Sequence, residues 1–128
     1  MEKQEYLLRI SILQQEAERI GQENENAVRQ ILELQELKNN LEFFQNSKNE
    51  NAFVSFGKGI FTEACIKNKE LLVNIGSNVA VKKSIPETIK LIDEQIKKLE
   101  QVKNELAKHL EALNLQLDSL ISGARQEK

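Results

Sequence analysis

Two long heptad patterns, one in each half of the chain, constrain its fold more than any other feature. Across residues 2–45 and again across residues 84–122, apolar residues recur at alternating spacings of three and four. The core positions of the first pattern are polar at Lys3, Asn24 and Lys38, and those of the second only at Lys103. Such length and regularity are typical of a coiled coil. We therefore predict two long helices that pack along a narrow apolar seam.

The two helices are expected to fold back on each other as an antiparallel pair. If residue numbers in facing layers add up to about 130, Leu41 meets Ile89. The polar core residues Asn24 and Lys103 then fall in neighbouring layers. A polar layer of this kind fixes the alignment of two helices at some cost in stability. The seam therefore predicts both the pairing and its register.

The segment between the helices, residues 52–83, has the character of β-structure. It contains four short runs rich in Val, Ile and Phe, separated by Gly, Asn and Lys. Residues 55–62 align with residues 74–81, each with an apolar residue, a Gly-x-Gly or Gly-x-Asn turn and a β-branched restart. Gly and Asn tolerate the positive φ angles that tight hairpin turns need. We predict two tandem β-hairpins with matching turns.

The expected fold is mainly α with a small β unit: an antiparallel two-helix coiled coil joined by two tandem β-hairpins, all in one domain. Ser84, with Glu87 three residues later, forms a capping box that starts the second helix, and Gly123 suits its C-cap. The predicted bounds are 2–45 for the first helix, 52–83 for the hairpins, 84–122 for the second helix and 123–128 for a frayed tail.

The hairpins look incomplete within one chain. All five phenylalanines lie in the β unit or at its junction with the first helix: Phe43, Phe44, Phe53, Phe56 and Phe61. Aromatic side chains bury large areas, and two short hairpins cannot shelter them all. Their edges would also be open to pairing. We expect hairpins from several chains to form a closed sheet or barrel in an oligomer.

The far ends of the two arms are more apolar than a two-helix seam requires. Five residues there are surplus to the heptad core, namely Leu7, Leu8, Ile12, Leu115 and Ile121. Contiguous exposed apolar surface marks a binding site. One interpretation is an adaptable grip on apolar segments of a partner, and the other is local packing or scattered surface leucines. The full candidate set at these tips is Tyr6, Leu7, Leu8, Ile10, Ile12, Leu113, Leu115, Leu117, Leu120 and Ile121.

The charge of the chain argues against a nucleic-acid partner. The formal net charge is −2, and nucleic-acid binding needs a basic face. The charge is uneven: residues 1–45 carry 5 basic and 9 acidic side chains, residues 46–83 carry 6 and 3, and residues 84–128 carry 7 and 8. This distribution indicates either solvated faces or the packing of unlike subunits. No apolar run exceeds three residues, so we expect no membrane span and no signal segment.

The residues that enzymes and metal sites need are sparse. Cys65 is the only cysteine, which excludes an internal disulfide and fits a reducing, cytoplasmic compartment. It is expected to act as a small apolar filler in a strand. His109 is the only histidine, so no His/Cys cluster can hold a metal. No nucleophile–base pair is evident. We expect no catalytic, cofactor-binding or metal-binding residues.

The order of long helix, two hairpins and long helix resembles the alpha-type subunit of the prefoldin family. Residues 53–64, FVSFGKGIFTEA, resemble that family's first hairpin, and residues 70–84, ELLVNIGSNVAVKKS, resemble its second hairpin and helix entry. Beta-type subunits have one hairpin, so two indicate the alpha type. Ser55 departs from the proline that related chains often carry.

The resemblance implies a hexamer of two alpha-type and four beta-type subunits, with the hairpins in a double β-barrel platform. The arm tips would hold non-native chains without ATP and pass them to a cytosolic group II chaperonin. The alternative is a coiled-coil scaffold or adaptor with specific partners and no such client role. The implied interface positions are Phe53, Phe56, Ile60, Phe61, Val73, Ile75, Val79 and Val81.

Overall fold

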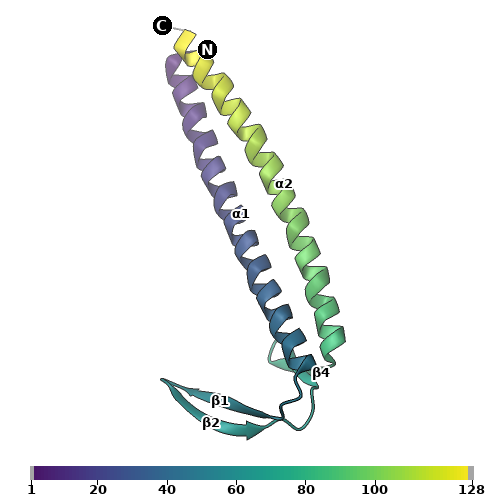
Figure 1. The fold of residues 1–128 in the computed structure, drawn as a ribbon. Coiled ribbons are helices and arrows are strands. Elements are labelled where there is room, and N and C mark those ends of the chain that lie inside the picture. The colour runs from purple at the N-terminus through teal and green to yellow at the C-terminus, as the bar shows by residue number, and fades with distance from the viewer. Residues whose placement is uncertain (1, 127–128) are drawn as a thin grey trace. The chain divides into compact units, whose positions relative to one another are not determined.

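A computed structural model describes residues 2–126, with side chains to Gly123. It has two long helices and two β-hairpins, which confirms the predicted fold class (Figure 1). In chain order the elements are α1 (Lys3–Asn46), β1 (Asn51–Gly57), β2 (Ile60–Cys65), β3 (Leu71–Gly76), β4 (Val79–Lys83) and α2 (Ile85–Gln126). The chain divides into two compact units: a helical unit, Met1–Glu33 with Ile96–Lys128, and a hairpin unit, Leu34–Gln95.

The helical unit is built on the predicted seam. Its core positions from Tyr6 to Ile31 and from Ile96 to Leu120 are all buried or half-buried, whereas Lys3 at the start of α1 is exposed. The buried members are Ile20, Ala27, Ile31, Leu113 and Leu117. Asn24 is half-buried in this seam, and its Oδ1 is buried without a hydrogen-bond partner in the described part of the chain. The heptad prediction is therefore confirmed in this unit.

Gly123 packs against the start of α1 instead of ending α2. The ring of Tyr6 lies 3.3 Å from the point that a Cβ atom at Gly123 would occupy. This contact places the start of α1 beside the end of α2 in the helical unit, as expected for an antiparallel pair close to the predicted alignment. The predicted C-cap was wrong, because α2 continues to Gln126 and the glycine provides room for the tyrosine ring. Of the predicted frayed tail, only residues 127 and 128 lie outside the described part of the chain.

The start of α2 lies in the hairpin unit and is capped by Ser84, as predicted. The backbone N–H of Glu87 donates to Ser84 Oγ at 3.2 Å, and the backbone N–H of Thr88 donates to the Ser84 carbonyl at 3.1 Å. Ser84 therefore caps the helix that starts at Ile85. Ile85 and Ile92 are the buried residues of this unit's seam.

The two hairpins are separate two-stranded antiparallel sheets with the same irregularity. The β1–β2 register shifts between Ser55 and Gly57, and the β3–β4 register shifts between Asn74 and Gly76. In each case the side chain before the shift accepts a hydrogen bond from the glycine N–H: Ser55 Oγ at 3.1 Å and Asn74 Oδ1 at 2.9 Å. Ser55, which departs from the family's proline, thus has the same local role as Asn74.

The turns of the two hairpins match as well. Gly57, Lys58 and Gly59 have φ angles of 101°, 50° and 79°. Gly76, Ser77 and Asn78 have φ angles of 110°, 52° and 61°. Positive φ at both central residues is the geometry of the type I′ turn, which suits the twist of a hairpin. The structure therefore confirms two tandem hairpins with matching turns.

Replacing Gly21 by alanine is expected to raise the free energy of unfolding by about 1 kcal/mol, because glycine is a poor helix residue. Apart from the adjacent residues and the backbone of its own helical turns, no described atom lies within 4 Å of the new Cβ position. Thermal unfolding followed by circular dichroism measures the change. Gly123→Ala is the matched control, and its free energy of unfolding should rise less, since the new Cβ would meet the Tyr6 ring at 3.3 Å. An equal rise in the free energy of unfolding at both positions would contradict the packing of Tyr6 against Gly123.

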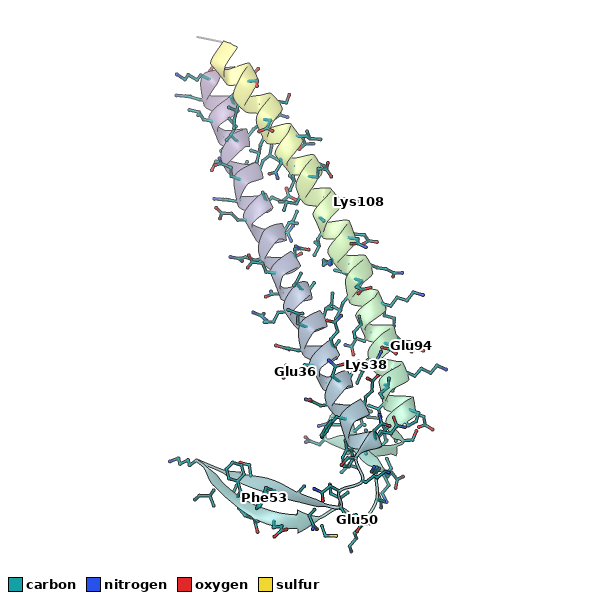
Figure 2. The ribbon with its side chains drawn as sticks, viewed as in Figure 1. Glu36, Lys38, Glu50, Phe53, Glu94 and Lys108 are labelled. Atoms are coloured by element: carbon teal, nitrogen blue, oxygen red, sulfur yellow. The ribbon has the colours of Figure 1, made fainter. Side chains whose placement is uncertain are left out.

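An ion pair links the helices in the hairpin unit. Lys38 Nζ lies 2.8 Å from Asp93 Oδ1, and the Lys38 side chain reaches toward α2 (Figure 2). The hydrogen bond to Asp93 and the negative charges of Asp93 and Glu42 outweigh desolvation and raise the pKa of Lys38 above its ordinary value of 10.5. Lys38 was predicted only as a polar position of the seam, and the structure supplies its partner.

This raised pKa predicts a pH dependence of stability. A group whose pKa is raised on folding stabilises the folded state below its unfolded-state pKa, and the effect is lost as the pH rises through the folded-state pKa. The stabilisation by Lys38 is therefore fully present below pH 10.5 and declines above it. Melting temperatures between pH 9 and 12 should fall more steeply for the native chain than for Lys38→Met. If the melting temperatures of the native chain and of Lys38→Met fall in parallel with rising pH, the prediction is contradicted.

Candidate interaction surfaces

The hairpins expose most of their large apolar side chains. Phe53 is 73% exposed and Phe56 is 72% exposed. Of the eight predicted interface residues, six are exposed, and Val73 and Val81 are half-buried because they face each other across β3 and β4. The exposed six are Phe53, Phe56, Ile60, Phe61, Ile75 and Val79. Leu72, at 71% exposure, belongs with them and was not predicted, although it lies in the same apolar run as Val73.

One face of the first hairpin collects two of the aromatic rings. Phe53 pairs with Glu63 across the strands, and Ser55 pairs with Phe61, so Phe53 and Phe61 are diagonal neighbours on the same face. The Phe53 side chain projects from β1 in Figure 2. Each sheet has only two strands, so every strand also has one edge without a strand partner. Such sheets are marginal alone and their open edges favour pairing with other strands.

The arm tips expose a second apolar set. Leu7, Leu8, Ile12 and Leu115 are exposed, at 56%, 63%, 55% and 65%. We refer to these four residues as the tip set. They are four of the five residues predicted to be surplus to the seam, and the fifth, Ile121, is half-buried.

The other candidates at the tips lie in the seam. Leu113 and Leu117 are buried at 5% and 9% exposure, so neither is available to a partner while the helices are paired, and they do not belong to the exposed surface. The physical reason is that both occupy core heptad positions. Tyr6, Ile10 and Leu120 are half-buried for the same reason.

A groove runs beside the tip set in the helical unit. Its volume is about 500 Å³, and it is lined from both helices by Arg9, Ile12, Leu13, Gln116, Ser119 and Leu120. The polar members were not predicted, because the pattern that identified the tips consists of apolar residues alone. Arg9 and Gln116 each directly precede a core residue of the heptads, and that position could have identified them. The groove therefore combines an apolar floor with polar side chains.

The remaining residues considered from the sequence have no catalytic arrangement in the described part of the chain. His109 Nε2 lies 4.0 Å from Glu16 Oε1, and both side chains are partly exposed. Cys65 ends β2 and is exposed, so in the chain by itself it does not act as the small apolar filler that was predicted. Within residues 2–126, no cluster of three or more His, Cys, Asp or Glu could hold a metal ion. Neither α1 nor α2, as far as they are described, has a stretch apolar enough to cross a membrane.

Comparisons with known proteins agree on one family. The family model described as prefoldin subunit matches residues 13–127. A prefoldin subunit alpha from Archaeoglobus fulgidus is 32% identical over 138 residues, covering 99% of this chain and 96% of the relative. A prefoldin subunit alpha from Methanobrevibacter smithii is 30% identical over 118 residues, covering 91% and 81%.

A solved structure has the same fold. It is the cryo-EM structure of filamentous PFD from Methanocaldococcus jannaschii, which aligns with a TM-score of 0.63 and 20% identity. The alignment covers 94% of this chain and 95% of the other.

Proposed function

Because this chain belongs to the prefoldin family, as an alpha-type chaperone subunit, we propose that it holds non-native polypeptides at its arm tips without ATP and passes them to a group II chaperonin. The observation that carries the proposal is the tip set, whose four aliphatic side chains stay exposed although the seam beside them is fully formed. Exposed apolar clusters of this kind bind apolar segments of other chains.

The hairpins supply the assembly that such a function needs. We propose that two copies of this chain and four beta-type subunits join through their hairpins. The exposed aromatic face and the open strand edges of the hairpins support this, since both would be covered in a closed barrel. Several arms on one platform would bind one client at several points, so weak single contacts would add up to useful avidity. A cytoplasmic location stays a prediction.

The alternative is a coiled-coil scaffold that assembles through the same hairpins and binds specific partners. The test mixes this chain with a beta-type subunit, measures the absolute mass by light scattering, and adds the complex to a chemically denatured test protein diluted into buffer without ATP. We expect a six-chain mass and strongly reduced light scattering from aggregates. A six-chain complex that leaves aggregation unchanged would favour the scaffold. Transfer is tested by adding a group II chaperonin with ATP and measuring recovered activity of the test protein.

A further inference from the structure

Lys69 makes an unusual contact across the hairpin unit. It belongs to the linker between β2 and β3, residues 66–70, and its Nζ donates to the backbone carbonyl of Gln45 at 2.9 Å and to that of Ser47. Nζ also lies 5.8 Å from the centroid of the Phe44 ring. One ammonium thus contacts Phe44 and Gln45 in the last turn of α1 and Ser47 just beyond it.

The end of α1 has a physical need for this cation. The last carbonyl groups of a helix have no partner within the helix, and the helix dipole places partial negative charge there. The last turn of α1 contains no basic residue of its own. Lys69, 22 residues beyond Ser47 in the sequence, supplies both the charge and the donors. The face of an aromatic ring adds a further attraction for an ammonium group.

A backbone hydrogen bond joins the same two segments. The N–H of Ile66 donates to the carbonyl of Glu50 at 2.6 Å, at the base of the first hairpin. Each segment is also ordered locally: Asn49 N–H donates to Ser47 Oγ at 3.2 Å, and Glu70 N–H donates to Asn68 Oδ1 at 3.0 Å. The segment that leaves α1 and the linker between the hairpins therefore meet as one junction.

We propose that Lys69 is a positioning residue that clamps this linker to the end of α1 and so sets how both hairpins are presented to partner subunits. The linker leads out of the first hairpin and into the second, so one contact restrains both. Restraint before binding lowers the ordering cost of association. The functional part of this inference rests on the proposed assembly through the hairpins, whereas the clamp itself is a property of the single chain.

The clamp is tested first in the chain alone. Cys65, the only cysteine, is exposed in β2, and Gln35→Cys adds a second exposed labelling site on α1 within the same unit. Pulsed electron paramagnetic resonance then measures the distance distribution between spin labels at these two sites. Lys69→Met is expected to broaden it, because the linker loses its contacts with α1. Lys69→Arg, which keeps the charge and the donors, should restore a narrow distribution.

Lys67→Met is the matched control, because it removes the same charge from the same linker at an exposed position. It should leave the distribution unchanged. Circular dichroism confirms that each variant keeps its helices. Equal distributions for the native chain and Lys69→Met would overturn the clamp, and so would equal broadening by Lys67→Met.

Assembly is the second readout. In titrations with a beta-type subunit, the concentration of that subunit at half-maximal assembly should rise about 3-fold to 10-fold for Lys69→Met, as expected for the loss of a partly exposed charged hydrogen bond. It should rise less than about 2-fold for Lys67→Met. Equal midpoints would overturn the role in presentation. If the native chain binds no beta-type subunit, the proposed function fails, and the distance measurement still decides on the clamp.

Discussion

Replacing Leu7, Leu8 and Leu115 together by serine is expected to weaken strongly the suppression of aggregation by the assembled complex. These side chains are 56%, 63% and 65% exposed, so they are available to a client and contribute little to the seam. Each leucine buried against a client contributes about 1.5–3 kcal/mol, and the loss recurs at every arm that carries the change. Light scattering from an aggregating test protein measures the effect, and the mass of the complex should not change.

The matched control removes three exposed aliphatic side chains elsewhere on the arms. Leu32→Ser, Leu91→Ser and Val102→Ser together replace residues that are 60%, 46% and 45% exposed. This variant should suppress aggregation as well as the native chain does. If the tip variant also retains full suppression, client binding at the tips of this chain is refuted. If both variants lose it equally, general surface apolarity and not the tip set is responsible.

Replacing Phe53 and Phe61 together by serine is expected to reduce the complex to unassembled chains. The two rings are 73% and 59% exposed on one face of the first hairpin, and aromatic side chains of this size dominate interface energetics. Light scattering on a sizing column, with a beta-type subunit present, should show the six-chain mass disappear. The coiled coil should survive, because neither residue belongs to the helical seam.

Phe43→Ser is the control for this experiment. Phe43 is 79% exposed on α1, outside both hairpins, so it tests the loss of an exposed ring without a change in the hairpin face. The control should keep the six-chain mass. A double hairpin variant that still assembles would refute this face as the interface. Loss of assembly in the control as well would extend the interface onto α1.

Much of the fold follows from local patterns in the chain. The heptad positions predicted the seam residues from Tyr6 to Leu120, because helical periodicity alone decides which face is apolar. The two turns at residues 57–59 and 76–78 were predictable because they contain glycine and asparagine, which tolerate positive φ. Ser84 identified the start of α2 because its hydroxyl is a local partner for free N–H groups.

The candidate surfaces were only partly predictable. The heptad pattern separated Leu115, which is surplus to the seam and 65% exposed, from the core residue Leu113, which is 5% exposed. It also counted Ile121 as surplus, although the structure leaves that side chain half-buried. The hairpin residues were assigned more completely, because two strands shelter so little that most of their apolar side chains stay exposed.

Periodicity and turn chemistry alone thus determine two paired helices and two hairpins, because both act between neighbours in the sequence. The contacts of Lys69 with the end of α1, of Tyr6 with Gly123 and of Lys38 with Asp93 emerge only in the tertiary structure. Each joins residues far apart in the chain, and a lysine or a glycine has no local pattern that identifies its partner. Packing brings them together, and it thereby decides which leucines remain exposed and how the hairpins are held.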